Sequence, residues 1–198
     1  MENVKNLVGN NHKGNFLKFL EYLESLGYTN SWAVLNARDY GIPQNRERVF
    51  CISELHGKKK FEFPEPIELK CKLYDILEKN VDDRYYLKNN QVLDEPICQE
   101  YSYCLTSSQW KGVTLNYFLE KRLRQLVTDK IDENGKYVPR RLTPKETWRL
   151  MGMSEEDIDK ASQLICQTSM YKQSGNSIVV SILEAIFEKL LKFPLKIN

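Results

Sequence analysis

The chain has 198 residues, of which 41% are hydrophobic, which is enough for one ordinary core or two small domains and too apolar for a disordered tail. Lysine and arginine total 29 against 27 aspartates and glutamates, so the formal charge of +2 does not by itself indicate a nucleic-acid partner. No apolar run approaches the roughly 18 to 20 residues that span a bilayer. The first residues also lack the apolar core of a signal peptide, so we expect neither a membrane nor a secreted protein.

The number and spacing of the cysteines bear on compartment and metal binding. Their total is odd, and no two have the spacing of a C-x-x-C pair or a zinc site; they stand at positions 51, 71, 98, 104 and 166. Free thiols of this kind are typical of a reducing compartment. We therefore expect a cytoplasmic protein without a metal site.

The first 55 residues predict a helix followed by two strands. Apolar residues recur at spacings of three and four over residues 14–27, which favours an amphipathic helix ending near Gly27. Trp32–Asn36 and Arg48–Ser53 are short stretches rich in valine, isoleucine, phenylalanine and tryptophan, and a segment with glycine and proline separates them. Two adjacent strands are the expected result.

From residue 56 to about residue 139 the sequence changes character. Three consecutive lysines at 58–60, prolines at 64, 66 and 96 and the lack of a sustained helical period indicate a separate, loop-rich module. Leu73–Leu77 fits a helical turn or two, Tyr117–Val127 has helix-compatible spacing, and Asn134-Gly135 marks a turn. The lysine run is either a phosphate contact or a solvated loop.

Two further helices are expected after this module. Thr143 is a good N-cap, followed by proline at the first helical position and an acidic residue in the first turn, and this helix should run to about Met151. Apolar residues on one broad face predict a last helix over Ile178–Leu191, packed against a core.

Four short blocks in a fixed order carry the strongest functional signal. They are E-N-V at Glu2–Val4, Q-N-R-E-R-V-F at Gln44–Phe50, R-R-L-T-P-K-E-T-W-R-L-M-G at Arg140–Gly152 and Y-K-Q-S-G-N-S-I at Tyr171–Ile178. Together they resemble the motifs of the C-terminal portion of DNA cytosine-5 methyltransferases. The resemblance spans nearly the whole chain, and Met153-Ser154 replaces the usual Phe-Pro ending of the third block.

The resemblance implies an α/β fold in two parts. Residues 1–55 would supply the late strands of an incomplete Rossmann-like methyltransferase large domain. Residues 56–168 would form a small, mixed, loop-rich target-recognition domain, and residues 169–198 a C-terminal helix that returns to the large domain. In this family the recognition domain reads base edges in the major groove of double-stranded DNA.

The resemblance also implies which residues take part in catalysis. Methylation at C5 requires a cytosine taken out of the duplex and made electrophilic at C6, and a carboxyl group can bond its N3 and N4 edge and share a proton with N3. Glu2 corresponds to that carboxyl group, Arg48 to a contact with the base oxygen O2, and Arg46 to a contact with the DNA backbone. The two arginines lie two residues apart, so on an extended segment they share one side. The alternatives are an exposed N-terminal carboxylate without a role and a solvated edge strand.

The last block is expected to hold part of the cofactor. Gly175 permits an unusual backbone turn just before a helix, and Asn176 and Ser177 are polar groups at the mouth of that helix. In the family this turn lines the S-adenosylmethionine pocket, so the resemblance implies a partial pocket with Asn176 and Ser177 as cofactor-binding residues. The same residues would also serve as an ordinary helix cap.

The recognition module contains a further, altered motif. Tyr103–Ser107 resembles the family's short T-L motif, but Cys104 stands where threonine is usual. Trp110 is expected either to stack on a base or to pack in a small core, which is the commoner role. The residues to which the resemblance assigns DNA contacts are Gln44, Arg46, Thr106 and Arg140.

Two motifs that precede E-N-V in the family do not occur in the chain. These are the glycine-rich cofactor loop and the Pro-Cys dipeptide that carries the nucleophile. No proline stands directly before Cys98 or Cys166, and both follow the Q-x-R-x-R block, so neither is assigned that role. We therefore expect a chain that is inactive alone and that joins a second chain with both motifs, or self-associates through an exposed sheet edge.

Two other functions stay open at this point. A non-catalytic DNA-binding module, or the remnant of an interrupted methyltransferase gene, would keep the recognition part without the chemistry. One branch of the family acts on RNA, although the Q-x-R-x-R block and the recognition module look more like the bacterial DNA enzymes.

Overall fold

A three-stranded antiparallel sheet forms one end of the molecule. The computed structural model describes residues 1–88 and 91–191. In the sheet β3 (Glu47–Leu55) lies between β1 (Glu2–Val4) and β2 (Tyr28–Asn36). The two predicted strands are thus confirmed as neighbours, each longer than expected. Pairing of β2 with β3 over their whole length, from Tyr28 opposite Leu55 to Asn36 opposite Glu47, accounts for the extension.

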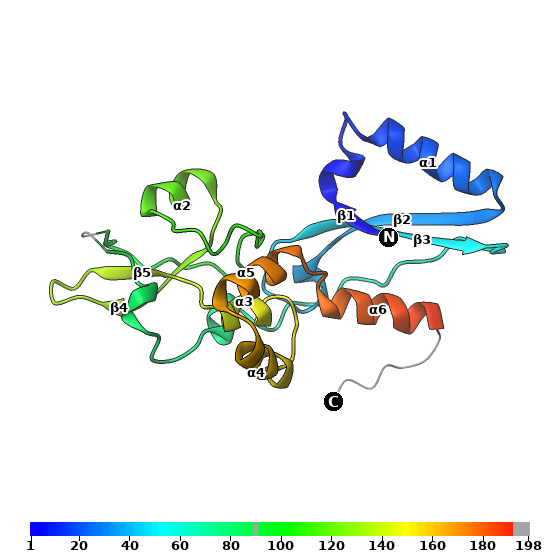
Figure 1. Cartoon of the computed structure of the whole chain (residues 1–198). Coiled ribbons are helices and arrows are strands. Elements are labelled where there is room, and N and C mark those ends of the chain that lie inside the picture. Colours follow the sequence, from blue (N-terminus) through cyan, green and yellow to red (C-terminus); the bar gives the residue numbers. More distant parts are fainter. Residues whose placement is uncertain (89–90, 192–198) are drawn as a thin grey trace.

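Helices cover both faces of this sheet, one above and one below in Figure 1. On one face α1 (Lys13–Ser25) buries Phe16 and Leu20 against Val49 and Cys51 of β3. On the other face α6 (Val180–Leu191) buries Ile182 and Ile186 in a cluster that includes Phe50, because side chains of successive strand residues point to opposite faces. Both predicted amphipathic helices are confirmed.

The opposite end of the molecule is built around a β-hairpin (Figure 1). Strands β4 (Leu126–Ile131) and β5 (Tyr137–Arg141) pair antiparallel, and the expected turn between them contains Gly135 with a φ of 76°. Around the hairpin lie α2 (Leu115–Lys121) and two single turns of 3-10 helix, η3 (Leu73–Ile76) and η4 (Asp83–Tyr85). A small apolar cluster under α2 holds the hairpin, and its buried members are Ile97, Phe118 and Leu126.

The helix expected over Tyr117–Val127 is only partly correct. Helix α2 ends at Lys121, and Arg122 and Arg124 both take positive φ angles of 52° and 55°. Leu126 and Val127 instead begin β4, where both are completely buried and pair with Arg141 and Arg140 of β5. Pairing with a strand from farther along the chain therefore overrides the local helical spacing.

Three short helices join the hairpin to the sheet. The first is α3 (Pro144–Arg149), which begins with a capping box in which Thr143 and Glu146 bond each other's backbone N–H, as expected for this start signal. Two more helices follow, α4 (Glu155–Leu164) and α5 (Gln167–Asn176). No helix in the described part of the chain is long and apolar enough to span a membrane.

A buried ion cluster ties the hairpin to α3. Arg140 of β5 is fully buried and donates hydrogen bonds to Glu146 at 2.8 and 2.9 Å and to Asp129 at 2.5 Å. Burial alone would lower the pKa of Arg140, but the hydrogen bonds and charges of Glu146 and Asp129 outweigh it and raise that pKa. The arginine is therefore charged, with its carboxylate partners in place.

Candidate functional site

Two of the sequence-predicted residues meet on one face of the sheet. Glu2 pairs with Phe50, so Arg48, two residues away on β3, lies diagonally across from it on the same side. The Nε atom of Arg48 lies 3.2 Å from Oε1 of Glu2. Their side chains are 16% and 19% exposed, so the pair is largely enclosed but still reachable from solvent.

Arg46 lies beside this pair and is occupied by the protein's own backbone. Its side chain is buried, and its guanidinium donates to the carbonyl oxygens of Leu105 at 2.9 Å, Gly175 at 3.1 Å and Ser177 at 2.7 Å. Burial lowers the pKa of Arg46, and the neighbouring charge of Arg48 lowers it further. Arg46 thereby links its own segment to the segment at Leu105 and to the segment at Gly175 and Ser177.

A cysteine completes the group. The Sγ atom of Cys104 lies 3.7 Å from Nη1 of Arg46 and 3.6 Å from Nη2 of Arg48. Both arginines thus reach one thiol. This agrees with the expectation that their side chains lie on the same side of an extended segment. Sequence reasoning assigned Cys104 no role, although its departure from the usual threonine was a visible signal. We call Glu2, Arg46, Arg48 and Cys104 the Glu2 cluster.

Gly175 holds the Cys104 segment in place, but not in the way expected. The residue does not form a turn ahead of a helix; it lies in the last turn of α5, and its φ is not positive. A Cβ atom there would lie closer than 3.0 Å to the backbone of Thr106 and Ser107. Glycine is required because the two backbones touch there. The next helix, α6, begins only at Val180, so Gly175 does not stand at its start.

The two expected cofactor residues lie at the junction of α5 and α6. Asn176 is exposed and Ser177 is half-buried, and both line a cavity of about 360 Å³. Trp148 and Met151 form an apolar part of the same cavity. Since the backbone oxygen of Ser177 accepts a hydrogen bond from Arg46, this cavity adjoins the Glu2 cluster.

The residues expected to contact DNA differ in how far they are buried. Gln44 is completely buried, where it donates to the carbonyl of Leu150 at 2.7 Å and accepts from the N–H of Leu105 at 3.0 Å. Arg140 lies in the ion cluster described above. Both side chains are therefore occupied by internal partners in this structure. Thr106 is partly exposed, and its hydroxyl forms a hydrogen bond with that of Ser108 at 2.9 Å.

An aromatic and basic surface lies close to this segment. Trp110 is 38% exposed, so it is not packed in a small core, which was the commoner of its two expected roles. The ammonium groups of Lys111 and Lys172 lie 5.7 and 5.5 Å from the centre of its indole ring. Lysine beside an exposed aromatic ring is a combination that suits stacking on a base next to a phosphate. Lys172 belongs to the fourth sequence block, but the sequence assigned neither lysine a role.

Comparison with known proteins identifies the class to which this fold and cluster belong. Residues 1–192 match the sequence model of the C-5 cytosine-specific DNA methylases. The chain therefore belongs to this family. Its fold resembles that of the Dnmt2 methyltransferase of S. pombe, with a TM-score of 0.72 at 20% identity over 99% of this chain and 67% of that one.

Two curated relatives show how much of a family member the chain represents. It is 62% identical to the Type II methyltransferase M2.ScrFI of Lactococcus lactis subsp. cremoris over 97% of this chain and 53% of that protein. It is 34% identical to the Type II methyltransferase M.DsaV of Dactylococcopsis salina over 98% of this chain and 56% of that protein. The chain thus spans about half the length of the curated relatives it matches.

Proposed function

We propose that the chain is the C-terminal portion of a DNA cytosine-5 methyltransferase that acts on a cytosine flipped out of a specific double-stranded sequence. The contact of 3.2 Å between Glu2 and Arg48 carries the proposal. A carboxyl group and a guanidinium that lie together in a largely enclosed site open to solvent can both hydrogen-bond the polar edge of one pyrimidine ring.

Each member of the pair has a distinct task in this proposal. The Glu2 carboxyl group bonds the N3 and N4 edge of the cytosine and holds a proton at N3 while a thiolate attacks C6. Arg48 donates to O2, which fixes the ring and stabilises negative charge on it. Arg46, with its guanidinium on three carbonyls, positions the Cys104 segment and does not itself reach the DNA backbone in this arrangement.

Asn176 and Ser177 are proposed to hold part of S-adenosylmethionine. Their cavity of about 360 Å³ is within the range of small-molecule sites, and it combines two hydrogen-bonding side chains with the apolar surface of Trp148 and Met151. The polar side chains of Asn176 and Ser177 beside an apolar wall fit one end of S-adenosylmethionine. The cofactor would supply an electrophilic methyl group, and the residues of this chain would orient it beside the Glu2 cluster.

The division of labour along the chain is also part of the proposal. Residues 1–55 and 169–198 contribute to the catalytic unit, and residues 56–168 form the target-recognition module. A separate apolar cluster around the β4–β5 hairpin supports this division. The main core crosses it, since Leu105 and Val127 pack in one cluster with Phe50, and α5 begins two residues before the boundary. DNA contacts are proposed for Thr106 and, in place of the buried Gln44 and Arg140, for Trp110 with its two lysines.

We further propose that a second chain completes the enzyme. Within the described residues β1 pairs only with β3, so its other edge offers unpaired backbone groups to a further strand. The relatives are about twice as long as this chain, so residues outside it would supply the glycine-rich loop and the Pro-Cys nucleophile. Self-association through the same edge is the competing outcome.

The described free cysteines support a cytoplasmic location.

Reconstitution tests the proposal. The chain is co-expressed with the N-terminal half of the Lactococcus relative, and transfer of labelled methyl groups to duplex DNA is measured. We expect transfer by the pair and by neither part alone, with a loss of about a hundredfold or more in Glu2→Gln. Glu47→Gln is the matched control, because Glu47 is a nearby carboxylate that binds the exposed Lys5 at 2.8 Å.

Two results would count against the proposal. Unchanged transfer by Glu2→Gln would remove the carboxyl group from the chemistry. A stable pair that binds duplex DNA but transfers no methyl group would favour the non-catalytic DNA-binding module, and transfer to RNA alone would replace the substrate.

A further inference from the structure

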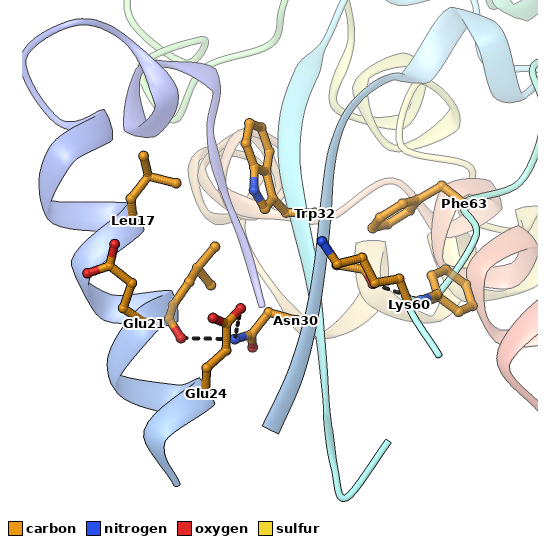
Figure 2. A pocket seen from close by; sticks show the side chains of 10 residues that line it. Leu17, Glu21, Glu24, Asn30, Trp32, Lys60 and Phe63 are labelled. Atoms are coloured by element: carbon orange, nitrogen blue, oxygen red, sulfur yellow. Dashed lines mark hydrogen bonds between the residues drawn. The ribbon is translucent and has the colours of Figure 1, made fainter. Parts of the chain in front are cut away.

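A second cavity lies at the edge of the sheet that is farthest from β1. It has a volume of about 430 Å³, is open to solvent and is lined by α1, the outer strand β2 and the segment that follows β3 (Figure 2). None of its lining residues belongs to the Glu2 cluster or to the cavity beside Asn176. The proposed methyl transfer therefore does not use it.

Aromatic and aliphatic side chains form much of its wall. Leu17 and Leu20 line it from α1 and Trp32 from β2, while Phe61 and Phe63 come from the segment beyond β3. The two phenylalanine rings meet edge to face at 5.1 Å, and the N–H of Phe61 donates to the Ser31 hydroxyl at 2.7 Å. That bond fastens the segment to β2. The aromatic wall is thus part of the fold.

One buried polar atom in this cavity lacks a partner. Asn30 is only 5% exposed, and its amide nitrogen donates to the carbonyl of Leu20 at 3.0 Å and to Glu24 at 3.4 Å. Figure 2 shows this amide reaching from β2 towards α1. Its oxygen, Oδ1, accepts no hydrogen bond from any described residue. Buried acceptors are nearly always satisfied, so a donor from outside the chain is expected there.

The charges around the cavity indicate what kind of donor fits. Glu21 and Glu24, three residues apart on α1, both line it, and neither forms an ion pair with another described residue. Lys60 lies across from them at the other wall (Figure 2). Two carboxylates and the Asn30 oxygen are acceptors, against one ammonium donor. Acceptors therefore dominate next to an aromatic surface, which also attracts cations.

We propose that this cavity binds a small organic cation, an ammonium group attached to an aromatic or aliphatic body. The ammonium would bond Glu24, Glu21 and the free oxygen of Asn30, and the body would lie against Trp32 and Phe63. The volume is within the range of sites for small molecules. The inference concerns a site apart from the Glu2 cluster and holds whether or not the chain takes part in methyl transfer.

Phenethylamine tests this site, with 3-phenylpropionate as the anion of similar size and ring. The full chain is labelled with ¹⁵N, and its three tryptophans give three indole N–H signals. The Trp32 signal is assigned with Trp32→Phe. We expect phenethylamine to shift it in a saturable way and 3-phenylpropionate not to. Equal binding of both compounds, or no saturable shift with phenethylamine, would overturn the proposal, as would shifts confined to Trp110.

Charge variants give a second, independent readout. Glu24→Gln keeps the acceptor for Asn30 but removes the charge, so phenethylamine should bind about tenfold more weakly. Lys60→Met removes the competing cation and should strengthen binding. Glu120→Gln, an exposed carboxylate on α2, is the control and should leave the affinity unchanged. Equal affinity in Glu24→Gln and Glu120→Gln would show that the carboxylates do not form the site.

Discussion

A Cβ atom at Gly175 would collide with the main chain at Ser107, because the last turn of α5 lies directly against the segment that carries Cys104. This contact, together with the three carbonyls bound by Arg46, sets where the Cys104 thiol lies relative to Glu2 and Arg48.

Replacing this glycine should loosen the site and the fold together. Gly175→Ala forces two backbones apart, so we expect a loss of about 1 to 3 kcal/mol in the free energy of unfolding, measured by thermal or urea denaturation. Gly14→Ala is the control, since a Cβ at Gly14, within α1, meets nothing within 4 Å, and alanine there should be neutral or stabilising. Equal effects of the two changes would show that the contact is not tight.

The buried arginine of β5 should be essential for stability. Arg140→Met leaves Glu146 and Asp129 without their cation, and breaking a buried pair from one side costs about 3 to 5 kcal/mol. Lys160→Met removes the exposed pair with Glu156, whose side chains are 65% and 76% exposed, and should change stability by less than about 1 kcal/mol. Urea unfolding measures both. A small loss in Arg140→Met combined with weaker DNA binding would return this residue to the DNA-contacting set.

Alkaline pH should weaken the fold through Tyr171. Burial raises the pKa of this hydroxyl, which donates to the carbonyl of Leu142 at 2.6 Å. The folded state then keeps a proton that the unfolded state loses near pH 10, about the usual pKa of tyrosine, so stability is full below that pH and falls above it. Tyr171→Phe should cost about 1 kcal/mol near neutral pH but reduce this alkaline fall. Tyr22→Phe, at a residue 62% exposed, should change neither. Urea midpoints across this pH range provide the measurement.

DNA binding should depend on Trp110 and its two lysines if the proposed function holds. Trp110→Ala should weaken binding of the reconstituted pair to its duplex by about 1 to 3 kcal/mol, while Trp110→Phe keeps a ring and most of the affinity. Lys172→Met should reduce the slope of log affinity against log salt by about one. Lys160→Met, at an exposed lysine paired with Glu156 on α4, serves as the control. Fluorescence anisotropy with a labelled duplex gives both values, and equal losses in the alanine and phenylalanine variants would exclude stacking.

Sequence reasoning was most successful where one local pattern and one long-range pairing agree. The apolar spacing over residues 14–27, the two strands and the capping box at Thr143 each specify an element that the fold keeps. The meeting of Glu2 with Arg48 came from a family resemblance. Their separation of 46 positions gives no local signal, and only the register of β1 against β3 brings them together.

The sequence is least informative where a polar residue serves the interior. Gln44 and Arg140 belong to recognisable motifs, and a motif alone does not distinguish a side chain that contacts a ligand from one that satisfies buried backbone groups. Gly175 was assigned to a turn, whereas it permits a close approach of two backbones. Both distinctions depend on partners from distant parts of the chain, which no local pattern reveals.

The way Arg46 is held has an evolutionary consequence. Its three oxygen acceptors are main-chain carbonyls, which every amino acid supplies, so these bonds do not depend on the side chain at Ser177. A segment held through its carbonyls can exchange its exposed side chains while Arg46 keeps its place beside Glu2 and Arg48.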